Sequence, residues 1–232
     1  NGELGDGTNT DRSTPTQTAS LGVGRTAVAI AAGNHHTCVV LDDGSVSCWG
    51  DNGEGKLGDG TTTDRSTPTQ TASLGAGRTA LSLAAGDSHT CGVLDNGSIV
   101  CWGDNNQGKI GDGTLVDRHT PTQTASLGVG RTAVAIAAGH YHTCAALDNG
   151  AVACWGMGSY GQLGDGTETS RNIPTQTSAL GTGVGAVGIS AGGFVTCSVL
   201  DDGSVVCWGE NFQGTLGDGT SVDRNTPTQT SS

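Results

Sequence analysis

Short runs of apolar and β-branched residues alternate with clusters of Gly, Asp, Asn and Ser along the whole chain, and no run keeps a helical period. Near the N-terminus these runs are TPTQTA (14–19), TAVAIAA (26–32), TCVVL (37–41) and SVSCW (45–49). The last two flank Asp42-Asp43-Gly44, which is typical of a three-residue hairpin loop that ends on a left-handed Gly. The pattern predicts short strands, and Pro15 places the Thr-rich run on a sheet edge.

The same pattern recurs every 53 residues without insertion or deletion. The pair Cys-Trp begins at Cys48, Cys101, Cys154 and Cys207. A four-stranded unit of this length indicates β-propeller blades, with a solenoid or a stack of small sheets as the alternative. We expect an all-β fold with a segment 1–20 that supplies an orphan outer strand, followed by blades at 21–73, 74–126, 127–179 and 180–232.

The stretch AVAIAAGNHHTCVVLDDGSVSCWGDNGEGKLGDGT resembles the regulator of chromosome condensation repeat. The resemblance rests on the strand ending in Ala-Ala-Gly, then His-Thr, Leu-Asp-Asp-Gly, Trp-Gly-Asp-Asn and Gly-x-x-Gly-Asp-Gly-Thr, and it recurs in all four copies. The Cys-Trp-Gly version is similar to repeats of this family in bacterial and environmental surface or secreted proteins. The resemblance implies a propeller, commonly of seven blades, with the run at 26–32 innermost.

The chain holds four repeats and 20 further residues, fewer than a seven-bladed ring needs. We therefore expect a partial propeller, or one that another chain completes. The founding member of the family promotes nucleotide exchange on a small GTPase at chromatin, but no residue here can be matched to the loops that carry that activity. A shared fold does not by itself transfer the function.

Each repeat carries Cys-x9-Cys across its predicted hairpin. With Asp42-Asp43-Gly44 as the loop, Val40 faces Val46 and Cys38 faces Cys48, and opposed residues at a non-hydrogen-bonded site have Cα atoms about 4.5 Å apart. A disulfide reaches that far, so the register predicts the pairs Cys38–Cys48, Cys91–Cys101, Cys144–Cys154 and Cys197–Cys207. Buried free thiols are the alternative, and the spacing is not that of zinc ligands.

The net charge of −12, with Lys56 and Lys109 as the only lysines, disfavours nucleic acid and anionic membranes as partners. No apolar stretch approaches the roughly 18 residues that span a bilayer, so no membrane insertion is expected. The chain has no nucleophile elbow, no phosphate loop and no lone Cys with a distant His. We expect neither an enzyme nor a cofactor.

Some polar residues recur as candidate ligands. His36, His89 and His142 occupy equivalent positions in three repeats, and Val195 occupies that position in the fourth. We therefore interpret them as structural histidines that bind a carbonyl at the blade edge. No metal site is assigned. Oxygen-rich turns recur in the repeats, for example before the pair Asp64-Arg65, and they are candidate calcium sites. The candidate ligands are Asp6, Asp59, Asp112, Asp165 and Asp218. The alternative is a plain Asp-Gly turn with a surface ion pair.

Trp49, Trp102, Trp155 and Trp208 are almost the only large side chains, so we expect them in the core and not on a sugar-stacking platform. Asn96-Gly97-Ser98 is a glycosylation sequon on a predicted hairpin loop. The orphan strand in 1–20 exposes an edge that invites pairing with another chain.

The repeats, the predicted disulfides and the orphan strand favour a non-enzymatic structural or interaction protein, secreted or on the cell surface, that self-assembles into an extracellular fibre, filament or sheath. Its expected partners are further copies of itself, or other extracellular proteins or glycans. The alternative is a propeller-type adhesin or inhibitor that binds protein or glycan through variable loops. Variation between repeats clusters at 34–36, 51–56 and 61–66 and their equivalents, for example Met157 to Gln162.

Overall fold

The computed structural model describes residues 1–231, which form sixteen strands in four antiparallel sheets. The first repeat forms β1 (Ala27–Ala32), β2 (His36–Leu41), β3 (Val46–Gly50) and β4 (Arg65–Gln70). The second forms β5 (Ala80–Ala85), β6 (His89–Leu94), β7 (Ile99–Gly103) and β8 (Arg118–Gln123). The third forms β9 (Ala133–Ala138), β10 (His142–Leu147), β11 (Val152–Gly156) and β12 (Arg171–Gln176). The fourth forms β13 (Ala186–Gly192), β14 (Val195–Leu200), β15 (Val205–Gly209) and β16 (Arg224–Gln229).

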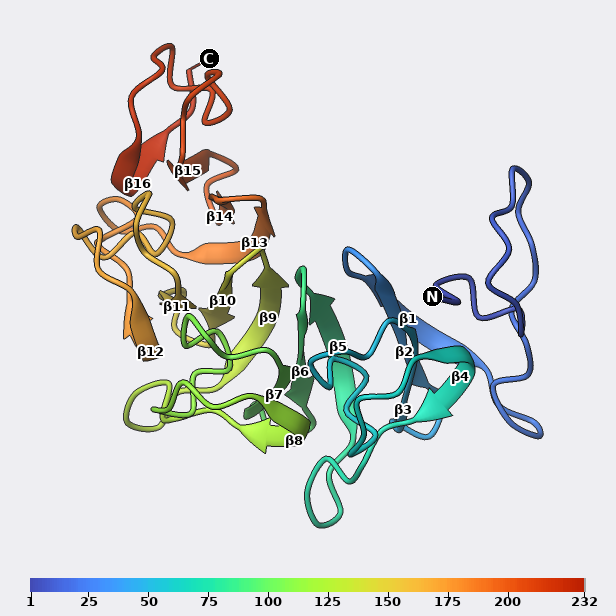
Figure 1. Cartoon of the computed structure of the whole chain (residues 1–232). Coiled ribbons are helices and arrows are strands. Elements are labelled where there is room, and N and C mark those ends of the chain that lie inside the picture. Colours follow the sequence, from blue (N-terminus) through green and yellow to red (C-terminus); the bar gives the residue numbers. More distant parts are fainter. Residues whose placement is uncertain (232) are drawn as a thin grey trace.

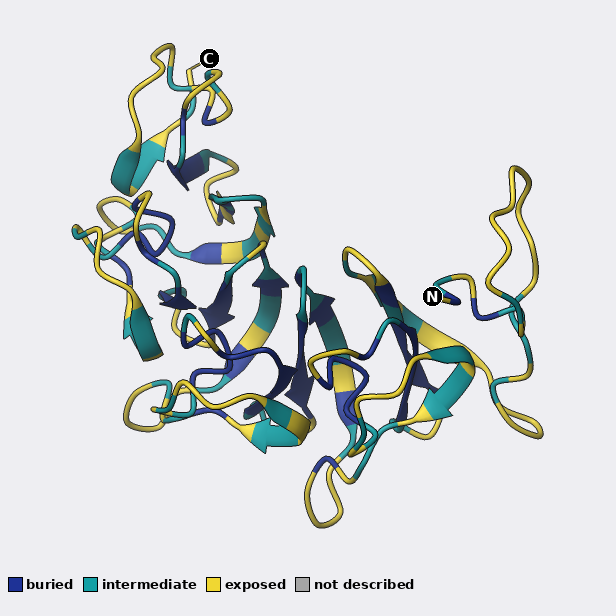
Figure 2. Cartoon of the chain, viewed as in Figure 1, coloured by how far each residue is buried: buried dark blue, intermediate teal, exposed yellow. Residues whose placement is uncertain are grey.

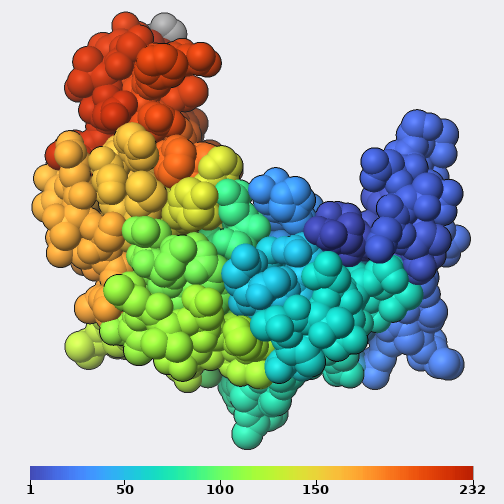
Figure 3. Space-filling model, viewed as in Figure 1, coloured from blue at the N-terminus to red at the C-terminus, as the bar shows by residue number. Residues whose placement is uncertain are grey.

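The four sheets are propeller blades arranged in an open arc (Figure 1). Within each blade the strands pair in chain order, and the first strands β1, β5, β9 and β13 contact one another along the inner side of the arc. The space-filling view shows the wide opening between the N-terminal and C-terminal parts (Figure 3). The all-β fold of four-stranded tandem blades is therefore confirmed, and the blades do not close into a ring.

The central hairpin of each blade has the expected register, with Cys38 opposite Cys48. Leu41 N donates to Ser45 O and Gly44 N donates to Leu41 O, and Gly44 has a φ of 75°, so the turn needs a residue without a Cβ. All eight cysteines are joined within their own hairpins, with Cα atoms 4.1 Å apart, as Cys38–Cys48, Cys91–Cys101, Cys144–Cys154 and Cys197–Cys207.

Most of the core lies between neighbouring blades, and one smaller cluster around Trp49 lies within the first blade. Side chains from β2 and β3 of the first blade pack against Ala80, Leu94, Val100 and Trp102 of the second, and the next two junctions repeat this cluster. Figure 2 shows the result, with buried strands in the middle of each blade and exposed loops around them. A blade with so few large side chains is thus stabilised mainly through its neighbours.

Residues 1–20 do not form the orphan outer strand that we expected at 14–19. The outer strand of each blade pairs with the third strand of its own repeat, as β4 does with β3, whereas the stretch 12–17 that corresponds to β4 is not assigned to a strand. Residues 1–8 instead occupy the place of the loop that precedes each blade. Gly7 N donates to Ser66 O at 2.9 Å, as Gly60 N does to His119 O one repeat later.

Candidate functional site

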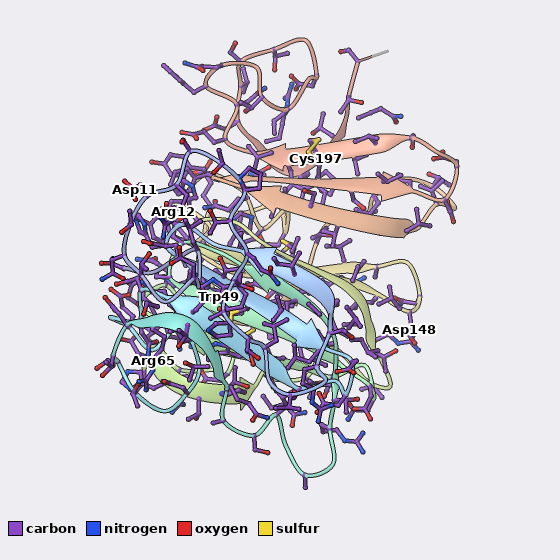
Figure 4. All side chains as sticks on the ribbon, turned by 90° about the vertical axis from the view of Figure 1, so that its right-hand side faces the viewer. Asp11, Arg12, Trp49, Arg65, Asp148 and Cys197 are labelled. Carbon is purple, nitrogen blue, oxygen red and sulfur yellow. A yellow bond between two sulfur atoms is a disulfide. The ribbon has the colours of Figure 1, made fainter. Side chains whose placement is uncertain are left out.

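The loops at the two ends of the blades differ in how much their sequence varies between repeats. The connections β1–β2 (33–35) and β3–β4 (51–64), with their equivalents, lie at one end, which we call the loop face. The hairpin turns lie at the other end, and Figure 4 shows Arg65 and Asp148 at opposite ends of the strands. All three segments that vary between repeats belong to the loop face. Any binding surface built from this variation is therefore on one side of the molecule.

A histidine on the second strand joins each blade to the next. His36 Nε2 lies 2.8 Å from Thr90 Oγ1, and Thr90 donates its own hydroxyl proton to Lys56 O at 2.9 Å. His36 must therefore donate from Nε2, which leaves Nδ1 as a buried acceptor without a partner. The same arrangement joins His89 to Thr143 and His142 to Thr196.

Burial keeps these imidazoles neutral. It lowers the pKa of His36 and of His142 to about 3, and it lowers the pKa of His89 well below its usual range. The acceptor is the Thr hydroxyl of the next blade, so our expectation of a carbonyl at the blade edge is wrong. Among residues 1–231, no three His, Cys, Asp or Glu side chains lie close enough together to hold a metal ion.

The tryptophans also act at the junctions. Trp102 is fully buried, and its indole N–H donates to Lys56 O at 2.8 Å. Trp155, Trp208 and Trp49 make the equivalent bonds to Lys109 O, Gln162 O and Glu3 O. The expectation that the tryptophans are core side chains is confirmed, and the polar atom of each indole holds the loop of the preceding repeat.

The aspartates proposed for calcium lie in a hydrogen-bonded loop. Asp59 accepts bonds from Thr61 and Arg65, and Asn52 Nδ2 donates to Asp59 and to two loop carbonyls. Although burial raises its pKa, the bonds from Thr61 and Arg65 hold the pKa of Asp59 below its usual range. Arg65 pairs with Asp59 and not with Asp64, which corrects the ion pair that we expected. The prediction made from the sequence, which assigns no metal site and names these five aspartates only as candidate calcium ligands, stays a prediction.

The third repeat departs from this loop design. Gly158 and Ser170 replace the Asn and Asp that tie the loop in the other three repeats, and the loop is held by a bond from Gly158 N to Ser170 Oγ. Met157 and Gln162 replace the ion pair that Asp51 and Lys56 form in the first repeat. Gln162 is buried, and its Nε2 atom has no hydrogen-bond partner in the structure.

Beside this altered loop, four rings from the loop face lie together at the junction of the third and fourth blades. We call them the aromatic cluster, and its members are His140, Tyr141, Tyr160 and Phe194. The ring of Phe194 lies 4.9 Å from Tyr160, 5.4 Å from His140 and 5.9 Å from Tyr141, measured between centroids. Tyr160 is 37% exposed, so part of the cluster faces solvent.

The aromatic cluster borders a hollow of about 290 Å³ at the ends of the inner strands, which we call the axial hollow. Its wall consists of Gly and Ala backbone, and its polar side chains are Asn34, Asp87 and His140. His140 Nε2 lies 3.6 Å from the Asp87 carboxylate. The candidate functional site therefore combines aromatic faces, a carboxylate and an imidazole around a concave surface. The variation between repeats marks these segments in the sequence, but no sequence pattern indicates that these particular residues meet.

Asn96 lies in the exposed turn of the β6–β7 hairpin, on the side opposite the loop face. Its Oδ1 atom accepts bonds from the backbone N–H and the hydroxyl of Ser98, so the sequon is held in an Asx turn. Asn96 is exposed, and its modification stays a prediction.

Known proteins resemble this chain over nearly its whole length. The ultraviolet-B receptor UVR8 of Arabidopsis thaliana is 34% identical over 228 residues, which are 98% of this chain and 51% of that protein. Human WBSCR16 superposes with a TM-score of 0.79 at 23% identity, covering 89% of this chain and 53% of that structure. The ectodomain of the receptor kinase CR4 from Physcomitrella patens has a TM-score of 0.52 at 27% identity, covering 84% and 44%.

This chain thus spans about half the length of these relatives. The family model described as the RCC1-like domain matches residues 1–232, which agrees with the repeats, the blades and the solved relatives. The chain belongs to the RCC1-like domain family of β-propeller proteins.

Proposed function

We propose that the chain is a non-enzymatic interaction protein that works in an oxidising environment, secreted or at the cell surface. The observation that carries this proposal is the set of four disulfides, one in every hairpin. Disulfides of this kind persist outside the reducing cytoplasm. A relative of the same fold forms the ectodomain of a plant receptor kinase, which supports an extracellular location. No membrane-spanning helix is found among the residues that the structure describes.

Self-assembly into a fibre or sheath is part of this proposal, and the four similar blades support it, because each packs its apolar side against the next. Val199 is 45% exposed, whereas its equivalents Val40, Val93 and Ala146 are at most 2% exposed because the next blade covers them. All four described sheets already have their own outer strand, so segment 1–20 finds no vacant edge there. Assembly of copies would therefore use the faces of the end blades and not strand addition.

Ligand binding through the loop face is the second candidate function. The aromatic cluster favours it, because exposed aromatic side chains are enriched at binding surfaces and the fold does not need them at the other junctions. A propeller-type adhesin or inhibitor would present such a surface to a protein or glycan.

Intact mass of the native protein, measured with and without reductant, tests the location, and light scattering tests the assembly. We expect reduction to add about 8 Da, two hydrogens for each of the four bridges, and we expect particles much larger than a monomer. Free thiols in native material would contradict the proposed compartment. A clean monomer with intact disulfides would contradict the fibre and leave ligand binding.

Glycosylation of Asn96 is a further element of the proposal. Secretion from a glycosylating host should add a glycan that an amidase removes from wild type and that is missing from Asn96→Gln. Asn149 occupies the same turn position in the third repeat but is followed by Gly150-Ala151, so it provides a site without a sequon. A glycan that persists in Asn96→Gln would refute the assignment.

A further inference from the structure

The repeat provides an internal control for the aromatic cluster. The same four backbone positions hold Asn34, His35, Glu54 and Ser88 at the junction of blades 1 and 2, so that junction forms with a single ring, the imidazole of His35. At the junction of blades 2 and 3 they hold Asp87, Ser88, Gln107 and Tyr141, with one aromatic ring. The concentration of four rings at the third junction is therefore not a requirement of the fold.

Other departures from the repeat fall at the same place. Compared with the first repeat, the loop at 157–162 has no counterpart of the buried Asn52, whose amide binds the loop, or of the ion pair between Asp51 and Lys56. It carries Tyr160 instead of a polar residue. On the facing blade, Gly193 and Val195 flank Phe194, and Gly193 has a φ of 55° that a side chain rarely adopts. His140 N donates to Gly193 O at 2.9 Å, which fixes the two aromatic loops against each other. Two blades have thus changed together, at positions that are adjacent only in the folded protein.

The charge of this surface disfavours an anionic ligand. The loop at 157–162 (MGSYGQ) has no charged residue, whereas the equivalent loops at 51–56, 104–109 and 210–215 all carry an acidic residue. The nearest lysine, Lys109, lies 5.0 Å from the centre of the Tyr141 ring, but it is fully buried and paired with Asp104. In a protein of net charge −12, an anionic ligand would find no free cation here.

We propose that the aromatic cluster and the axial hollow together form a binding site for a neutral saccharide, an assignment that rests on the proposed ligand-binding function. Sugar rings present C–H faces that pack on aromatic rings, and hydroxyls that need donors and acceptors. Tyr160 and Phe194 supply ring faces. Asp87 and His140 supply an acceptor and a polar nitrogen at the edge of the hollow. A hollow of about 290 Å³ lies at the small end of ligand pockets and suits one or two sugar units.

Titration calorimetry with soluble hexasaccharides tests the proposal. The neutral probes are cellohexaose, chitohexaose and mannohexaose, and a heparin hexasaccharide is the anionic probe. The variants are Tyr160→Gln and Phe194→Ser, whose new side chains already occur at the equivalent places as Gln107 and Ser88. The control is Phe212→Ser, which removes an aromatic side chain that is 77% exposed and lies outside the aromatic cluster.

We expect at least one neutral probe to bind wild type, and each cluster variant to weaken that binding by about 2- to 12-fold. Phe212→Ser should bind like wild type. Ring-proton shifts of Tyr160 and Phe194 in wild type, on addition of the same probe, provide a readout that needs no variant. Binding of heparin alone, equal affinity in the cluster variants, or no binding of any neutral probe at millimolar concentration would each overturn the site.

Failure of the saccharide site and failure of the proposed function give different results. If native material has intact disulfides and binds a protein ligand through Phe194, but binds no neutral saccharide, the interaction function stands and the carbohydrate assignment is wrong. If native material contains free thiols, the proposed compartment is wrong whatever the saccharide result.

Discussion

His36 Nε2 on the first blade donates a hydrogen bond of 2.8 Å to Thr90 Oγ1 on the second, and the Thr90 hydroxyl in turn donates to Lys56 O. Both side chains are buried, so the bond lies where water cannot replace it. One side chain therefore joins the second strand of one blade to the second strand and the preceding loop of the next. The fourth blade carries Val195 at this position.

Replacing this histidine should loosen the junction between the blades. We expect His36→Val to lower the free energy of unfolding by about 1–3 kcal/mol, because the Thr90 hydroxyl is left without its buried donor. Urea unfolding followed by tryptophan fluorescence measures the change. The control is His35→Ser, since His35 is exposed and Ser88 already occupies the equivalent position. A loss as large in the control as in His36→Val would contradict a specific role for the bond.

The neutral histidines make the fold sensitive to acid. The folded pKa of His36 and of His142 is about 3, whereas an unfolded histidine titrates near 6.5. Between these values the unfolded chain binds more protons, so stability is fully present above about pH 6.5 and falls as the pH drops toward 3. The loss should be of the order of 2 kcal/mol for each histidine between pH 7 and pH 4.5.

Stability measured against pH checks this prediction. The double variant His36→Val, His142→Val should start less stable than wild type at pH 7 but lose less on acidification to pH 4.5. Carboxylates such as Asp59 and Asp218 have a lowered pKa, so their contribution to the folding stability is lost only at a pH below this range. Parallel profiles for wild type and the double variant would show that the histidines do not cause the loss.

The disulfides should stabilise each hairpin independently. A bridge that closes a loop of this length, with a sequence separation of 10, contributes about 2–3 kcal/mol in the chain-entropy description. The double substitution Cys91→Ala, Cys101→Ala should lower the unfolding free energy by about that amount, and Cys144→Ala, Cys154→Ala should do the same in its own blade. Denaturant unfolding under non-reducing conditions measures both. An unchanged midpoint in both variants would contradict the prediction.

The indole of Trp102 leaves no room for a side chain at Gly58. It has a φ of 70°, and a Cβ at this position would lie 2.7 Å from the indole nitrogen of Trp102. Gly77 has a φ of 66° but no atom within 4 Å of the added Cβ, so Gly77→Ala measures the backbone cost alone. We expect Gly77→Ala to cost about 1 kcal/mol and Gly58→Ala to cost about 2 kcal/mol more, measured by thermal unfolding. Equal losses would show that the contact with Trp102 is unimportant.

Much of one blade was predictable because it is set by residues close together in the chain. The turn Asp42-Asp43-Gly44 places Cys38 opposite Cys48, and this register follows from the alternation of side chains along two adjacent strands. The acceptors of Trp102 and His36 were not predictable in the same way. They lie on a preceding loop and on the next blade, 46 and 54 residues away, and no local pattern specifies them.

The sequence by itself determined the repeat, the four-stranded blades and the disulfide pairs, because turn chemistry and side-chain alternation act over a few residues. Only the tertiary structure decided which variable residues meet. Tyr160 and Phe194 lie 34 positions apart in sequence, in different repeats, and their rings come to 4.9 Å because packing of the third blade on the fourth brings two loops to one edge.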